Sequence, residues 1–364
     1  MKLPILLYRY IGQQFLINFC ALLMILLSIV YLFDFIELLR RSSSHPDVSI
    51  SIITKMTLLK LPEVGQMLFP FAVLFSSIFT FWRLARTQEL VVIRSTGLSA
   101  WQFLLPILLS SILLGILAIV LVNPISSALL SKYEVMETEY LHKKSNLVTI
   151  SKTGLWLRQD QEQGYSIIHA KSFTPHKWTL NNVIIFYMDE NGRMLKRIDA
   201  HSAQLIKNAW LLHDVLLHTK EPFPEKFDEH KIFTELTGEE IEDSFASPET
   251  LPFWRIPEFI RTMEDTGFSS VRLRVHFQSL LSRPFIFAAM VLLAAAVSLR
   301  PPRQGGITFL VVIGVGIGFF IFFMESILHA FGISQQIPVA LAAWTPASVS
   351  LLLGSAAILH LEDG

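Results

Sequence analysis

The sequence predicts an α+β membrane protein in which three transmembrane helices precede, and three follow, an inserted antiparallel β domain. Only 16% of the residues are charged and 52% are hydrophobic, whereas about 25% of residues are charged in soluble domains. The mean hydropathy is +0.49. Six apolar runs approach or exceed the roughly 20 residues that cross a bilayer core. The region 125–275 between the third and fourth runs has a more polar composition.

The first three spans are expected near the N-terminus. Residues 11–33 and 64–82 contain no charged residue, and the membrane part of the third span is expected at 101–122. The first run exceeds the apolar core of a signal peptide, which is about 7–15 residues long, and no small-residue cleavage site follows it. We therefore expect this run to remain in the protein as a transmembrane helix.

The last three spans are expected after the polar region. Sixteen uncharged residues separate Arg283 from Arg300, and this short span is expected to be completed by flanking arginines that reach the interface. The fifth and sixth spans are expected at 304–324 and 338–359. Gly314 and Gly318 form a small-xxx-small pattern, which predicts close packing of the fifth span on a neighbouring helix.

The distribution of basic residues predicts the orientation, because short cytoplasmic loops carry an excess of lysine and arginine. With the N-terminus inside, the cytoplasmic side holds seven of them, namely Lys2, Arg9, Arg83, Arg86, Arg94, Arg300 and Arg303. The other side holds four, namely Arg40, Arg41, Lys55 and Lys60. Both termini are therefore expected in the cytoplasm, and the inserted domain is expected in the periplasm of an organism that has one.

Alternating apolar residues predict that the insertion is an antiparallel sandwich or roll. Asn191-Gly192 is a hairpin signal, and Cys20 lies in the first span, so the domain is expected to hold together without disulfides. The expected strands are 154–158, 165–172, 182–189, 194–206 and 210–218, and a short amphipathic helix is expected at 256–263. The predicted domains are thus 1–124, 125–275 and 276–364.

The segment 84–98 between the second and third spans predicts a short capped helix. Thr87 is the expected N-cap, Glu89 complements the helix N-terminus, and Gly97 is suited to end the helix. Ser99 and Gln102 predict a capping box for the next helix. This much local structure favours a docking element for a second protein. The alternative is a helix lying on the lipid surface, helped by its arginines. The candidate docking residues are Arg86, Glu89, Leu90, Ile93, Arg94 and Gly97.

Charged residues also lie at the outer ends of the predicted spans. Such groups are costly within a membrane and usually face a cavity, a partner or each other. Glu325 and His329 are four residues apart, on one face of the fifth span. Ordinary interfacial anchoring is the alternative for Arg40, Arg41 and Lys60, and simple packing is the alternative for Glu325. The other rim residues are Asp34, Glu37, Glu63 and Arg283.

Catalytic motifs are absent from the sequence. It contains no GxxxxGKS or GxxxxGKT phosphate loop, so the chain is not expected to hydrolyse ATP. A nucleophile elbow and a zincin motif are absent as well. The spacing of His201, His213 and His218 favours ordinary strand side chains over a metal site, and no metal is expected.

Four further sequence features carry a resemblance to a known family. They are Tyr8–Ile11 (YRYI), Glu89-Leu90 with Gly97, Gly154–Trp156 (GLW) and Arg300–Gly306 (RPPRQGG). With the arrangement of the spans, they make the chain similar, over essentially its full length, to the LptF/LptG permeases of the lipopolysaccharide ABC exporter. YRYI and GLW are more similar to the LptG branch. The resemblance implies a periplasmic β-jellyroll and a location in the bacterial inner membrane.

The resemblance also implies partners. One LptF and one LptG would enclose a lipid cavity, and segment 84–98 would be the coupling helix that docks on the LptB ATPase dimer. Glu89 stands where the family has an acidic residue that pairs with a basic residue of LptB. ATP and Mg would act in LptB, with no cofactor bound directly to this chain. LptC and a periplasmic bridge would receive the lipopolysaccharide, and no nucleic acid is involved.

In the family, the lipid enters between the first and fifth spans. The expected cavity-mouth residues are therefore Phe33, Asp34, Glu37, Arg40, Arg41, Lys60, Arg283, Phe322, Glu325 and His329. Asp34 departs from family members that carry a basic residue in this region. Three alternatives stay open: an LptF-type subunit, a lipid enzyme using Glu325 and His329, and a non-transporting anchor. Co-purification with a cytoplasmic ATPase would separate the transporter from the enzyme and the anchor.

Overall fold

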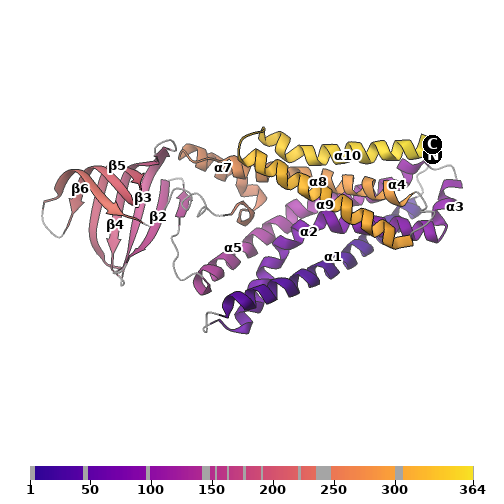
Figure 1. Cartoon of the computed structure of the whole chain (residues 1–364), viewed down its shortest axis with the longest axis horizontal. Coiled ribbons are helices and arrows are strands. Elements are labelled where there is room, and N and C mark those ends of the chain that lie inside the picture. The colour runs from indigo at the N-terminus through magenta and orange to yellow at the C-terminus, as the bar shows by residue number, and fades with distance from the viewer. Residues whose placement is uncertain are drawn as a thin grey trace. The chain divides into compact units, whose positions relative to one another are not determined.

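The computed structural model divides the chain into two compact units (Figure 1). A helical unit contains Met1–Tyr133 and Arg274–Gly364, and a β unit contains Glu134–Leu273. The sequence placed these boundaries at 124/125 and 275/276. The structure describes residues 5–43, 48–95, 99–141, 148–151, 154–161, 164–174, 178–189, 192–219, 223–234, 247–299 and 306–363.

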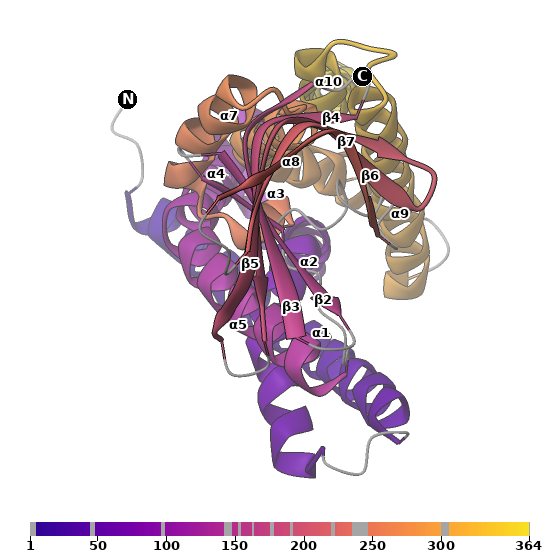
Figure 2. The same ribbon diagram turned by 90° about the vertical axis from the view of Figure 1, so that its left-hand side faces the viewer.

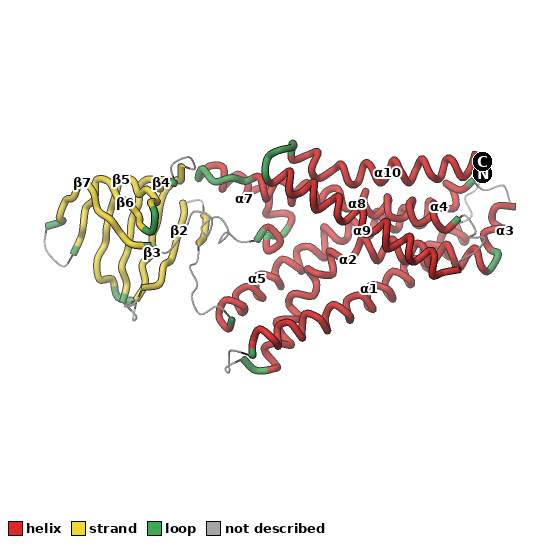
Figure 3. The backbone as a smooth tube through the Cα atoms, in the orientation of Figure 1, coloured by secondary structure: helices red, strands yellow, loops and turns green. Residues whose placement is uncertain are grey.

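Among the described residues, six helices are long and apolar enough to cross a membrane, as the sequence predicted (Figure 3). α1 has 38 residues, about 57 Å at 1.5 Å per residue, so it extends well beyond a bilayer core of about 30 Å. The helices are α1 (Ile5–Ser42), α2 (Ile50–Arg86), α4 (Ala100–Leu117) continuing into α5 (Asn123–Tyr140), α8 (Val271–Ser298), α9 (Gly306–Ile333) and α10 (Val339–Asp363). The short α3 (Glu89–Ser95) connects α2 to α4.

The third span is a single long helix with a defect in its middle. A π-helical turn, Ala118–Val122, joins α4 to α5. Pro124, the second residue of α5, has no N–H to donate to the carbonyl four residues earlier, which interrupts the regular helical ladder. The sequence placed the end of this span near Val122. The helix instead runs on to Tyr140, which is why the boundary between the compact units falls later than predicted.

α2 and α8 are the most buried of the six long helices, and α1 and α9 are the least buried. α1 packs against α2 and α4, while α9 packs against α2 and α10. Gly314 and Gly318 of α9 lie against α2: a Cβ at Gly314 would be 2.7 Å from Ile78 Cδ1, and one at Gly318 would be 3.0 Å from the Phe71 ring. The close packing that the small-xxx-small pattern predicted is confirmed.

This contact supplies a test of the packing. Gly314→Leu should push α9 away from α2 and destabilise the protein by about 1–3 kcal/mol, the usual cost of overpacking. Gly316→Leu is the matched control, because a Cβ at Gly316 meets nothing within 4 Å. Thermal unfolding in detergent should show a lower midpoint for the Gly314 variant alone. Equal midpoints for the two variants would contradict the packing contact.

The described strands of the β unit form one curled antiparallel sheet, seen from another side in Figure 2. Neighbouring strands follow one another along the chain, and each pair is antiparallel. The predicted inserted antiparallel domain is therefore confirmed, with the connectivity of a meander rather than the crossed connections of a jellyroll. The strands are β1 (Val148–Ser151), β2 (Gly154–Gln161), β3 (Gly164–Thr174), β4 (Thr179–Met188), β5 (Met194–Ile206), β6 (Ala209–His218) and β7 (Glu225–Phe233).

Local sequence explains the turns of this unit. The β4–β5 hairpin closes with a 3.0 Å hydrogen bond from Asp189 N to Arg193 O, and Gly192 takes φ +72° there. Two 3₁₀ turns, Pro248–Thr250 and Phe253–Arg255, precede α7 (Ile256–Asp265), the predicted amphipathic helix. After α7, Gly267 has φ +87°, and a Cβ there would collide with Phe173 O. Glycine is therefore needed where α7 meets β3.

Candidate functional site

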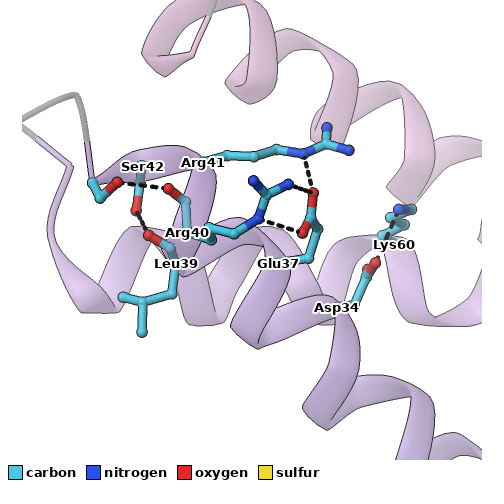
Figure 4. Close-up of polar contacts among 8 residues, drawn as sticks. Asp34, Glu37, Leu39, Arg40, Arg41, Ser42 and Lys60 are labelled. Atoms are coloured by element: carbon cyan, nitrogen blue, oxygen red, sulfur yellow. Dashed lines mark hydrogen bonds and ion pairs between the residues drawn. The ribbon is translucent and has the colours of Figure 1, made fainter.

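The end of α1 and the first half of α2 carry a cluster of charged side chains (Figure 4). Asp34, Glu37, Arg40 and Arg41 are spaced three or four residues apart, which places them near one another on α1. Lys60 of α2 joins them: its Nζ donates to Asp34 Oδ1 over 3.1 Å. The same Nζ lies 5.7 Å from the centre of the Tyr133 ring on α5. Lys60 thus contacts both neighbouring helices.

Glu37 is shared by the two arginines. Arg40 donates from Nε and Nη2 to the two carboxylate oxygens over 3.0 and 2.8 Å, and Arg41 donates from Nε to Oε1 over 2.8 Å. The five side chains named here, three cations and two carboxylates, together carry one positive charge in excess. The Arg40 side chain is 74% exposed, and these two bonds use only two of its five N–H donors. The cluster can therefore accept an external anion.

A second polar group lies within the helical unit, between α2, α8 and α9. Arg283 sits in the middle of α8 and donates from Nη1 to Gln66 Oε1 of α2 over 2.9 Å. The predicted completion of a short fourth span by snorkelling of Arg283 is therefore wrong: α8 begins at Val271, and a glutamine on the neighbouring helix binds the guanidinium. His329 Nε2 lies 2.6 Å from Ser279 Oγ.

The predicted cavity-mouth residues therefore separate into two groups by their contacts. Asp34, Glu37, Arg40, Arg41 and Lys60 form the α1–α2 cluster, with the exposed Phe33 on the same helix. Arg283 and His329 belong to the second group, in which Glu325 is partly buried one turn before His329. Phe322 contacts Phe71 of α2, with 6.1 Å between ring centres.

Sequence reasoning missed the uncharged partners in both groups. Gln66, Ser279 and Tyr133 carry no charge, and each meets its partner across helices far apart in the chain. One signal was present for Gln66, because it is a strongly polar residue near the start of the apolar run 64–82. Polar residues within a span usually mark an interhelical contact.

The α3 connector departs from the predicted capping. Thr87 does not cap α3: its backbone N–H donates to Arg83 O, and its hydroxyl lies 3.0 Å from the same carbonyl and 2.9 Å from Glu89 Oε1. Thr87 is instead the C-cap of α2, whose free carbonyls compete for its hydroxyl. Gln88, with φ +60°, precedes α3. The predicted Ser99–Gln102 capping box is confirmed.

Side-chain exposure changes the predicted docking face of α3. Leu90 is only 8% exposed and belongs to the core of the helical unit, so it anchors α3 and is not a surface contact. Val92, which the sequence analysis did not select, is 63% exposed. Arg86 lies over the Trp82 ring, 5.2 Å from its centre. The side chains of Ile93 and Arg94, and residue Gly97, lie outside the described residues.

Two donors hold the Glu89 carboxylate. In addition to the Thr87 hydroxyl, the Tyr10 phenol of α1 hydrogen-bonds to it. Tyr10 lies within the YRYI motif. The start of α1, the connector α3 and the end of α10 lie at the same end of the helical unit (Figure 1). Glu89 therefore links the first span to the connector.

Among the described residues, no group of three histidine, cysteine, aspartate or glutamate side chains is placed to hold a metal ion. In the β unit, His213 lies 3.6 Å from Glu229, and His218 lies 3.4 Å from Asp199. These are cross-strand pairs on the sheet. In the helical unit, by contrast, the polar side chains described above form ion pairs near helix ends and hydrogen bonds between helices.

In the described part of the chain, six membrane-spanning helices, a folded connector and an inserted β domain define the class of this protein as a multi-pass membrane protein. The chain belongs to the LptF/LptG family: the family model described as lipopolysaccharide export system permease LptF/LptG matches residues 9–360. It is 22% identical to the lipopolysaccharide export system permease protein LptG of Escherichia coli K12 over 354 residues, 95% of each chain. It is also 22% identical to LptG of Haemophilus influenzae over 361 residues, covering 95% of this chain and 96% of that protein.

Proposed function

We propose that this chain is a permease subunit, of the LptG type, in a transporter that extracts lipopolysaccharide from the bacterial inner membrane. The observation that carries the proposal is the family match over 9–360, which includes all six spans and the inserted β domain. With both termini in the cytoplasm, three spans place the β unit in the periplasm. LptF would be the second permease subunit, and LptC with the periplasmic bridge would receive the lipid.

ATP hydrolysis takes place in the partner ATPase in this proposal. An LptB dimer docks on α3, where Val92 is exposed and Glu89 is oriented by Thr87 and Tyr10. The exposed Arg86, at the end of α2, lies next to this surface. Leu90 fixes α3 to the helical core, so a push on α3 is transmitted to α2 and α4. ATP and Mg bind LptB, and this chain supplies the mechanical connection.

The lipid path lies along α1 and α9. Both helices expose large apolar side chains to their surroundings, including Ile25, Ile29 and Leu32 on α1 and Phe319, Phe320 and Phe323 on α9. Such side chains suit acyl chains.

At the outer end of α1, the single excess positive charge of the α1–α2 cluster suits the phosphates of the lipid headgroup. Arg40, the most exposed arginine of the cluster, is the principal anion contact.

Purification of the complex from membranes tests this function directly. We expect the tagged chain to bring down a cytoplasmic ATPase and a second permease subunit, and mass spectrometry of the bound lipid to identify lipopolysaccharide. A complex without an ATPase would support the anchor instead. A complex with the ATPase but carrying only phospholipids would refute the choice of substrate.

The β unit should be required for delivery and dispensable for insertion. Replacing Glu134–Leu273, the whole compact unit, by a glycine–serine linker should leave the six spans assembled with the ATPase. Passage of lipid to the bridge should fall to background, because a sheet edge such as β7 can no longer add a neighbouring strand. Transfer is measured by photocrosslinking of lipid to the bridge protein. Normal transfer by the shortened protein would contradict this role.

A further inference from the structure

A polar contact inside the helical unit joins the outer half of α9 to α8. His329 Nε2 lies 2.6 Å from Ser279 Oγ, and the same hydroxyl lies 2.8 Å from Val275 O. Ser279 is 6% exposed. A hydroxyl has one hydrogen and two lone pairs. Ser279 can therefore donate to its own helix and accept from His329, or donate to His329 directly.

Close packing surrounds this contact. Gly332 follows His329 by three residues, hence on the same face of α9. A Cβ at Gly332 would lie 2.5 Å from Ala342 Cβ of α10 and 3.3 Å from Val275 Cγ2 of α8. Val275 is also the residue whose carbonyl the Ser279 hydroxyl reaches. The outer end of α9 is thus held by a glycine contact and a polar contact at the same level of α8.

α8 serves as the fixed support for this arrangement. One turn after Ser279, Arg283 binds Gln66 of α2, the other well-buried helix. Towards its start, α9 is held by Gly314 and Gly318 against α2. The opposite face of α9 exposes Phe319, Phe320 and Phe323. The position of the outer half of α9 therefore depends on the contacts at His329 and Gly332.

We propose that Ser279 and His329 are a positioning pair that sets where the outer half of α9 stands, and with it the width of the lipid opening that α9 borders. The proposal rests on the proposed lipid path for its functional consequence. Its structural part, the attachment of α9 to α8, is testable without lipid. Neither residue needs to touch the substrate.

The geometry predicts unequal effects for the two partners. Without Ser279, the Nε2 atom of the partly buried His329 loses the hydroxyl that lies against it. Without His329, the Ser279 hydroxyl still has the Val275 carbonyl. Ser279→Ala should therefore displace α9 more than His329→Leu does, and the double variant should resemble His329→Leu. Ser279→Thr, which keeps a hydroxyl, should restore most of the wild-type behaviour.

The test uses the full complex in nanodiscs containing lipopolysaccharide, with photocrosslinkers at Phe322 on α9 and Phe33 on α1. Ser279→Ala should reduce lipid crosslinking at Phe322 about three- to tenfold, the size expected for one interhelical hydrogen bond. Crosslinking at Phe33 should be unchanged. Hydrogen exchange of the amides near His329 should be faster by a similar factor, and lipid released per ATP should fall.

Ser282→Ala is the matched control. Ser282 is 1% exposed on the same helix, and its hydroxyl donates to the Ser279 carbonyl. Hydrogen exchange and crosslinking that are the same in the Ser279 and Ser282 variants would overturn the positioning pair. No lipid crosslink at either position in the active wild-type complex would overturn the proposed lipid path. Hydrogen exchange would still decide whether the pair holds α9.

Discussion

Glu89→Lys should uncouple lipid export from ATP hydrolysis. The Glu89 carboxylate accepts hydrogen bonds from Thr87 and Tyr10, and a lysine would turn those donors toward an ammonium group that cannot accept them. In the proposed complex it would also face a basic residue of the ATPase. An exposed ion pair is worth only about 0.2–1 kcal/mol. Reversal of a charge in a partly desolvated interface costs several kcal/mol, so a loss of tenfold or more is expected.

Two measurements on the purified complex check this prediction: retention of the ATPase on the tagged permease and lipid released per ATP hydrolysed. Ser95→Lys is the control, because it introduces a lysine at an exposed position of the same short helix and leaves the carboxylate in place. Glu89→Gln should be intermediate, since the amide still accepts a hydrogen bond. Normal coupling in the Glu89→Lys complex would remove Glu89 from the docking interface.

The number of spans could be predicted from composition because crossing a bilayer requires a long apolar run, and such runs are local in sequence. Their ends could not be predicted in the same way. α1 continues nine residues past Phe33 to Ser42, through charged residues that satisfy one another on the helix surface. α5 likewise carries the third span to Tyr140. Hydropathy reports where the membrane is, whereas the helix continues as long as its backbone bonds are satisfied.

The order of the strands could not be predicted from the sequence, for a related reason. The alternation of apolar residues and the Asn191-Gly192 turn identified β4 and β5 well, because both signals are local. The choice between a sandwich and a single curled sheet depends on which strands pair across the whole domain. Sequential pairing from β1 to β7 is compatible with the same alternation, so the pattern could not separate the two.

The same distinction, between contacts local in sequence and contacts between distant helices, applies to the candidate site. The sharing of Glu37 by Arg40 and Arg41 follows from spacing on one helix and could be predicted. The Asp34–Lys60 bond joins residues of two helices, as do Gln66–Arg283 and Ser279–His329, and no local signal names these pairs. Leu90 was assigned to docking because an apolar residue on a short helix can face a partner or the core. Burial decides that question, and here it places Leu90 in the core.

Arg40→Glu should weaken lipid binding far more than Asp34→Ala. The α1–α2 cluster holds one positive charge in excess, so Arg40→Glu makes it net negative, whereas Asp34→Ala makes it more positive and frees Lys60. The free carboxylate at position 40 would also compete with Glu37 for Arg41. A phosphorylated headgroup should be repelled in the first variant and retained in the second, where the loss of the α1–α2 ion pair costs some stability.

Photocrosslinking at Phe33 in cells that make the lipid provides the measurement, and we expect crosslinks to be nearly absent for Arg40→Glu. On the isolated wild-type complex, crosslinks should fade when ATP is added. Lipid binding to the isolated complex should also weaken at higher salt, because salt screens exposed charges. Arg9→Glu is the control, since it reverses an exposed arginine at the opposite end of α1. An equal loss of crosslinking in Asp34→Ala and Arg40→Glu would contradict the prediction. It would show that lipid binding requires the Asp34–Lys60 ion pair between α1 and α2, and that the excess positive charge does not bind the headgroup.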